Sequence, residues 1–285
     1  MEAVFGAQGL RAGWGVLLFL GVYIALSSPA ELATATARSG ETGPMSLQTA
    51  LLQEGSGLIA VLLASFVMAR VEGRAMAAYG YGGPRIISRA LWGLFWGILC
   101  VSGLVGLMLA GGMLVFDGVS LHGPDILQYG IGWALACCAT GLYEEALLRG
   151  YLQSTLARGM GFWRAAILLS TAFGLWHLTN DAESPFGLLV AAVGGFIFCI
   201  SLRYTGSLWW AVGFHAGWDW AQGFLFGLPD SGIALRGTLL GMHASGNPAW
   251  SGGATGPEGS LLTAPVLMLI ALGMYIWWPV RQHGH

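Results

Sequence analysis

The stretch Gly141-Leu-Tyr-Glu-Glu-Ala-Leu-Leu-Arg-Gly150 places two adjacent carboxylates and an arginine inside a segment that otherwise has the composition of a membrane-spanning helix. A charged side chain near the bilayer centre costs about 2.5–3.5 kcal/mol on insertion scales, so these groups need partners, water or a catalytic purpose. Glu145 and Arg149 are spaced i,i+4 with the acid first, an order that favours a local ion pair. Because successive helical positions are rotated by about 100°, Glu144 points away from that pair.

The composition of the whole chain predicts an integral membrane protein in contact with lipids. The hydrophobic fraction is 55%, the charged fraction is 9% and the mean hydropathy is +0.67, values that a water-soluble domain of 285 residues could hardly bury. The 12 basic residues are all arginines and form no basic patch, so nucleic acid is not expected as a partner. The four cysteines lie in apolar runs without C-x-x-C spacing and are interpreted as packing residues.

Hydropathy predicts an all-α polytopic bundle of about eight spans, each near the ~20 residues that cross a bilayer. The predicted spans cover residues 14–28, 51–68, 91–115, 127–148, 165–178, 186–202, 207–226 and 261–278. The first is the shortest, and a cleaved signal peptide is an alternative for it. A polar stretch follows at 31–44. The Gly-, Ser- and Pro-rich segment 227–260 is predicted to be a flexible loop without chemistry.

The arginines predict how the bundle is oriented. With the N-terminus in the cytoplasm, nine arginines fall on the cytoplasmic side and only Arg38 and Arg236 fall outside, which agrees with the positive-inside rule. The nine are Arg11, Arg70, Arg74, Arg85, Arg89, Arg158, Arg164, Arg203 and Arg281. An even number of spans also returns the C-terminus to the cytoplasm. In this topology Glu144 lies toward the cytoplasmic end of its span, so we expect its surroundings to open to the cytoplasm.

Three further polar side chains interrupt apolar segments. His177 follows Phe173 by one helical turn in the fifth predicted span, and His215 and Asp219 share one face of the seventh. A lone intramembrane histidine more often ties two helices together than it catalyses a reaction. Leaving Glu144 and Asp219 both buried without partners, however, would cost about 5–7 kcal/mol, which is comparable to the stability of a domain. A shared polar cavity is the less costly interpretation.

Taken in chain order, the motifs Glu144-Glu145-x-x-x-Arg149, Phe173-x-x-x-His177 and His215-x-x-x-Asp219 resemble the signature of the CPBP family, the CAAX-type and bacteriocin-processing intramembrane proteases. The resemblance covers residues 125–228. It implies a four-helix catalytic core within a single membrane domain spanning residues 1–285, a membrane-associated protein or peptide substrate, and a location in a bacterial cytoplasmic membrane.

The resemblance also implies roles for individual residues. Glu144 and His177 would activate water, and His215 with Asp219 would stabilise the oxyanion, while the spacing of Glu145 and Arg149 indicates structural support. An ionised Asp219 can only accept hydrogen bonds, so it is expected either to orient His215 or to remain protonated.

The dependence of the predicted site on a metal stays open at this point. Two histidines and a carboxylate are a ligand set for catalytic zinc, and His177, His215 and Glu144 could supply it. A metal-free glutamate protease is favoured. Two other classes of function also stay open, a non-catalytic membrane immunity or scaffolding protein and a small transporter. A transporter would be expected to contain paired broken helices and an internal repeat, and neither is found in the sequence.

Overall fold

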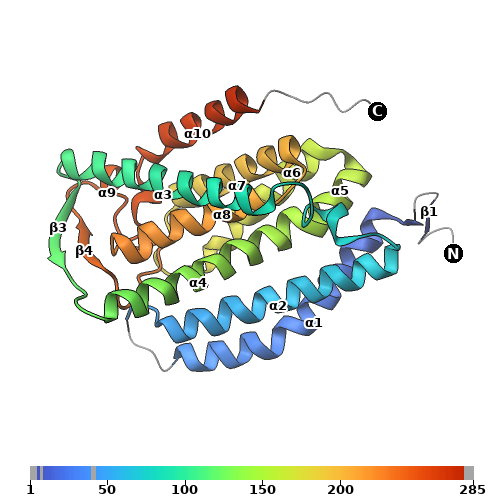
Figure 1. Ribbon diagram of the computed structural model, residues 1–285, viewed down its shortest axis with the longest axis horizontal. Coiled ribbons are helices and arrows are strands. Elements are labelled where there is room, and N and C mark those ends of the chain that lie inside the picture. The colour runs from blue at the N-terminus through green and yellow to red at the C-terminus, as the bar shows by residue number, and fades with distance from the viewer. Residues whose placement is uncertain (1–4, 7–8, 40–42, 279–285) are drawn as a thin grey trace.

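Helices that run back and forth along one common axis form most of the structure, a computed structural model that describes residues 5–6, 9–39 and 43–278 (Figure 1). The longer helices are α1 (Ala12–Ser39), α2 (Leu47–Glu72), α3 (Ile86–Ala110), α4 (Asp125–Glu145), α5 (Gln153–Met160), α6 (Phe162–Trp176), α7 (Pro185–Thr205), α8 (Trp209–Asp219) and α10 (Thr263–Trp277). Short helical segments are η1 (Met76–Tyr79), η2 (Ala146–Leu152), η3 (His177–Thr179), η4 (Trp220–Leu225), α9 (Pro248–Ser251) and η5 (Pro257–Gly259). The strands are β1 (Phe5–Gly6), β2 (Gly9–Leu10), β3 (Leu114–Val119) and β4 (Leu240–Ala244). The predicted all-α membrane bundle is confirmed.

Each of the eight predicted spans falls on a helix, but not all of these helices have the length of a full span. Within the part of the chain that the structure describes, five segments are long and apolar enough to cross a membrane. They are residues 12–36, 47–72, 86–110, 125–160 and 185–205. The helices α6, α8 and α10 are shorter, with 15, 11 and 15 residues, and η4 extends α8 by 6 residues. The expected length of about 20 residues is therefore wrong for α6 and α10, whereas α8 together with η4 fills most of its predicted span.

The N-terminal helix α1 continues well beyond the predicted span, so the expectation of a polar connection after residue 28 is wrong. Its second half is rich in alanine and contains no glycine, a composition that favours a helix. Thr34 also bonds back to the carbonyl of Ala30 at 3.0 Å. The first half is packed into the bundle, where Phe19 is fully buried and stacks on Tyr151 at 5.0 Å.

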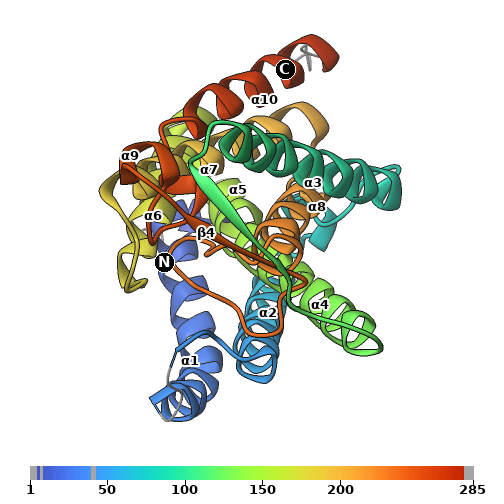
Figure 2. The same cartoon turned by 90° about the vertical axis from the view of Figure 1, so that its left-hand side faces the viewer.

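The segment 227–260 is folded, contrary to the prediction of a flexible loop. Its strand β4 pairs with β3 in antiparallel register, and Figure 2 shows this pair crossing one end of the bundle. The predicted third span ran into β3, but the helix ends at Ala110, before Gly112 with its positive φ of 69°. Small polar side chains in the segment are buried, including Ser260 and Thr255. Glycine, serine and proline here build tight turns rather than a linker.

The two ends of the bundle differ in charge. One end, the arginine end, carries the loops at 73–85 and 206–208, which are joined by a hydrogen bond from Leu208 N to Gly80 O. The other, the hairpin end, carries β3, β4 and α9 (Figure 1). Most of the arginines assigned to the cytoplasmic side lie at or near the arginine end, together with the first described residues. Arg281 lies outside the described residues.

Reciprocal glycines hold α3 against α8, the helix that carries His215 and Asp219. A Cβ on Gly93 or Gly97 of α3 would overlap carbonyl oxygens of α8, and a Cβ on Gly213 or Gly217 of α8 would overlap those of α3. Such small-xxx-small pairs allow close backbone approach in lipid, where apolar burial no longer drives helix association. This contact sets the position of α8 and hence of its two polar side chains.

Candidate active site

A cavity of about 580 Å³ lies within the bundle and collects polar side chains from distant parts of the chain. Its polar lining includes Glu31, Gln53, Glu54, Thr140, Glu144, His177, Asn180, His215, Asp219, Asp230, Ser231 and Glu258. The four residues predicted to be catalytic are all in this set, which brings together side chains from α4, η3 and α8. Glu145 and Arg149 lie behind the wall and are not part of it.

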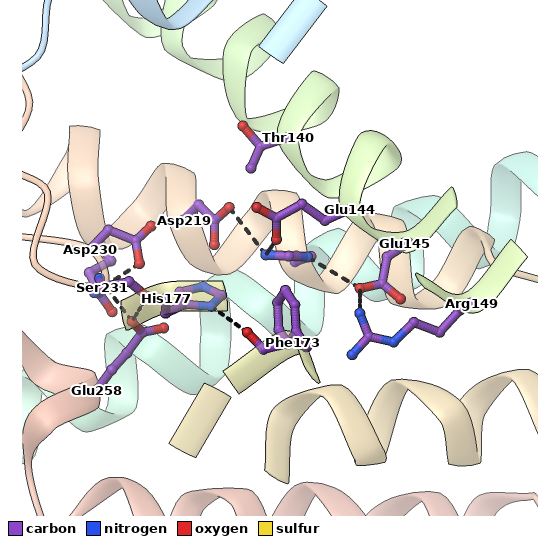
Figure 3. Close-up of polar contacts among 12 residues, drawn as sticks. Thr140, Glu144, Glu145, Arg149, Phe173, His177, Asp219, Asp230, Ser231 and Glu258 are labelled. Carbon is purple, nitrogen blue, oxygen red and sulfur yellow. Dashed lines mark hydrogen bonds and ion pairs between the residues drawn. The ribbon is translucent and has the colours of Figure 1, made fainter. Parts of the chain in front are cut away.

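His215 is the centre of a carboxylate cluster. Its Nε2 lies 3.5 Å from Glu144 Oε2 and 3.7 Å from Asp219 Oδ2, and its Nδ1 lies 3.5 Å from Glu145 Oε1. The imidazole therefore has a carboxylate near each ring nitrogen, an arrangement that favours the protonated ring. Asp219 thus lies beside His215, and its role in orienting the ring stays a prediction. Figure 3 shows Asp219, Glu144 and Glu145 in a row across the cluster.

The predicted ion pair between Glu145 and Arg149 is present. Arg149 Nη1 donates to Glu145 Oε1 at 3.1 Å, and both side chains are fully buried. The guanidinium also lies over the rings of Phe173, at 4.5 Å, and Phe198, at 5.8 Å, where cation–π attraction adds to the ion pair. A Cβ on Gly195 of α7 would occupy the space of Arg149 Nη2. The arginine is thus held by packing as well as by charge.

Both helices that supply these carboxylates change geometry directly after them. After Glu145, α4 continues as the π-helical segment η2, in which Gly150 leaves helical geometry with ψ −113°. After Asp219, α8 continues as the π-helical segment η4. Wide π turns redirect the side chains around them and are frequent at functional sites.

His177 is oriented by the backbone of its own helix. Its Nδ1 lies 2.8 Å from the carbonyl oxygen of Phe173. A carbonyl can only accept, so Nδ1 carries a proton and donates it to this contact, which leaves Nε2 outside the contact. The ring of Phe173 packs edge-on against His177 at 4.7 Å and against His215 at 6.1 Å. The sequence reading had placed Phe173 and His177 on one face and had not assigned Phe173 this bridging position.

Glu144 and His177 were expected to act together on a water molecule, but they do not contact each other directly. Glu144 contacts His215, and His177 contacts Phe173, although Glu144 and His177 line the same cavity. Glu144 Oε2 is buried and accepts no hydrogen bond from the described residues. That oxygen is enclosed beside His215 Nε2, while the Glu144 side chain as a whole is 16% exposed and lines the cavity.

Residues 127–221 match the family model for "Type II CAAX prenyl endopeptidase Rce1-like". This part of the chain is similar to that family. The match contains all three motifs on which the resemblance to CPBP proteases rested, so the resemblance is confirmed. It supports a membrane protease of the CAAX type. No curated protein matches the chain.

The cavity also contains acidic residues from outside the Rce1-like segment, and sequence reasoning missed them. Glu54 comes from α2, where an acidic residue inside a predicted span was an available signal. Asp230 and Glu258 come from the segment predicted to lack chemistry, in which they are the only acids. Ser231 joins them, donating to Glu258 Oε2 from its amide at 3.0 Å and its hydroxyl at 2.8 Å. The cavity is thus not built by residues 125–228 alone.

The cavity lies toward the hairpin end of the bundle. Its lining includes the end of α1, the start of α2, residues 179–180, residues 230–235 and the start of α10, all of which are at that end. No residue of the loops 73–85 or 206–208 belongs to it. The expectation that the surroundings of Glu144 open on the arginine-rich side is therefore wrong. The sequence could not show the position of the cavity along the bundle, because that position depends on how the ends of the helices pack against one another.

The zinc ligand set proposed from the sequence does not assemble in the described residues. No three His, Cys, Asp or Glu side chains among them are arranged as a metal site. His177 Nδ1 is held by the carbonyl of Phe173, which leaves Nε2 outside this contact, and Glu144 Oε2 lies beside His215 Nε2. The metal dependence of the site stays a prediction.

Proposed function

We propose that the protein is an intramembrane endopeptidase in which Glu144 acts as the general base. The observation that carries the proposal is the position of the Glu144 carboxylate, which lies beside His215 and lines a cavity that also contains His177 and Asp219. The family match to an endopeptidase supports the reaction class. A carboxylate that lines the cavity can take a proton from a water molecule held there.

His177 assists in activating the water molecule. Its Nε2 is free to accept a proton because Nδ1 is committed to Phe173. Water held between Glu144 and His177 would attack the scissile carbonyl, and the proton it loses would pass to the carboxylate and then to the leaving amine.

His215 supplies the positive charge at the oxyanion. Glu144, Glu145 and Asp219 each lie within 3.5–3.7 Å of its ring and favour its protonated form. A protonated imidazole donates to the negative charge that develops on the carbonyl oxygen. Asp219 then holds the ring in place, and its i,i+4 spacing on α8 keeps the two side chains on one face.

Metal independence is tested by Asp219→Asn together with a chelator. We expect the variant to retain or exceed the wild-type activity, because the amide keeps the shape of the side chain and adds an N–H donor beside His215. Activity should be indifferent to chelator, and elemental analysis should find no stoichiometric zinc. Chelator-sensitive activity that zinc restores would contradict the glutamate mechanism.

We place the protein in a bacterial cytoplasmic membrane with both termini in the cytoplasm. This orientation puts the hairpin end, and with it the cavity, on the outer side. The orientation can be tested with single cysteines introduced at two exposed positions. One is Ala78, in the 73–85 segment at the arginine end, and the other is Ser120, which follows β3. Native Cys138 is also exposed, unlike the packing cysteine that was expected, and is replaced by serine.

In intact cells we expect a membrane-impermeant maleimide to label Ser120→Cys fully and Ala78→Cys only after permeabilisation, because the reagent cannot cross the bilayer. Labelling is read by gel shift, and the Cys138→Ser parent is the control. The reverse pattern would invert the orientation without affecting the proposed chemistry.

A further inference from the structure

The wall of the cavity is strongly acidic. Six carboxylates line it, those of Glu31, Glu54, Glu144, Asp219, Asp230 and Glu258. No arginine is among the described residues that line it, and the chain contains no lysine. Of these lining residues, only His177 and His215 have basic side chains. Arg149 does not line the cavity and forms its ion pair with Glu145.

Among the described residues, these carboxylates have few positively charged partners. Glu144 and Asp219 both lie beside Nε2 of His215, so a single imidazole is the partner of two carboxylates. Glu258 accepts from the backbone and hydroxyl of Ser231, which carry no charge. Asp230 accepts from an amide, that of Gln222, at 3.3 Å. The cavity therefore has an excess of acids over bases.

The electrostatics of Asp230 show the consequence of this excess. Burial, followed by the charges of Asp219 and Glu258, raises the pKa of Asp230 well above its ordinary value. A positive charge entering the cavity would offset both the burial and the repulsion. A negative charge would add to the repulsion, and it would find no arginine in the wall to receive it.

We propose that the cavity selects peptide segments with a basic side chain next to the scissile bond and discriminates against a free C-terminal carboxylate. The proposal rests on the endopeptidase function above and names its substrate class. A CAAX motif ends in such a carboxylate a few residues beyond its cysteine. The acidic lining of the cavity is therefore expected to disfavour a CAAX substrate, the kind named in the description of the matching family model. Asp230 and Glu258 form a group beside His177 in Figure 3. These two carboxylates are the ones that would bind the basic side chain of the substrate.

The test uses full-length protein in nanodiscs of zwitterionic phosphatidylcholine, so that basic peptides gain nothing from the lipid. A peptide library is digested, and mass spectrometry locates the cleaved bonds. Matched peptides are then made around one bond with Arg, Gln or Glu beside it, each with a free or an amidated C-terminus. We expect kcat/KM to be at least about tenfold higher for Arg than for Gln, and lowest for Glu with a free carboxylate placed close to the bond.

The double variant Asp230→Asn/Glu258→Gln should bring the Arg-to-Gln ratio close to one. Asp117→Asn is the matched control, because Asp117 is an exposed acid on β3 that pairs with His243 and does not line the cavity. It should leave the ratio unchanged. Equal cleavage of Arg and Gln peptides by the wild type, or an unchanged ratio in the double variant, overturns the proposal.

A binding measurement separates this proposal from the proposed function. The same peptides, fluorescently labelled, are titrated onto Glu144→Gln protein, which needs no turnover. Arg peptides should bind at least about tenfold more tightly than Gln peptides, and the preference should disappear when Asp230→Asn/Glu258→Gln is added. If this holds while the wild type cleaves nothing, the endopeptidase function fails and the selection of basic peptides stands. If Arg, Gln and Glu peptides bind equally well, the proposal that the cavity selects basic peptides is wrong.

Discussion

Glu144→Gln is expected to reduce peptide-bond hydrolysis by about 10²–10⁴-fold while leaving the melting temperature nearly unchanged. The amide has the volume of the carboxylate and can still contact His215, so the fold loses little. It cannot take a proton from water, so the base is lost. The effect should appear in kcat more than in KM, because the side chain acts in the transition state and binds little of the substrate.

The measurement compares wild type and Glu144→Gln, both reconstituted, on the membrane peptide fragments that the wild type releases. Circular dichroism and thermal melting confirm equal folding. A variant that cleaves at the wild-type rate would show that Glu144 is not the base. Absence of cleavage by both proteins, with a partner still captured by both, would favour the non-catalytic immunity or scaffolding alternative.

Glu145→Gln is expected to act on stability, with a loss of about 3–5 kcal/mol in the free energy of unfolding. The substitution leaves the Arg149 guanidinium buried without its counter-charge, and neither side chain has any exposure through which water could compensate. Activity should fall too, because Glu145 Oε1 also lies 3.5 Å from His215 Nδ1. The stability loss distinguishes this variant from Glu144→Gln.

A second substitution should partly reverse that loss. Arg149→Leu added to Glu145→Gln removes the unpaired charge and leaves an apolar side chain beside Phe173 and Phe198, so the double variant should be more stable than Glu145→Gln alone. A double-mutant cycle based on denaturation in detergent gives the coupling energy. Additive effects of the two substitutions would show that the ion pair does not stabilise the fold.

Local patterns in the chain determined much of what was predicted correctly. Each of the eight apolar segments is a helix, because hydropathy and helical propensity act over neighbouring residues. The pairs at i,i+4 also behaved as expected: Arg149 meets Glu145, Asp219 meets His215, and His177 lies one turn from Phe173. One helical turn fixes such contacts whatever surrounds the helix.

Tertiary structure alone decided how the cavity is completed and where it opens. Glu54, Asp230 and Glu258 reach it from separate segments, and no spacing along the chain relates them to Glu144. The glycine contact between α3 and α8 sets which face of α8 meets α4, so Glu144 lies against His215. The sequence determined which side chains are costly to bury in lipid. Their partners follow from packing between helices far apart in the chain, and that packing depends on the shapes of whole surfaces rather than on local spacing.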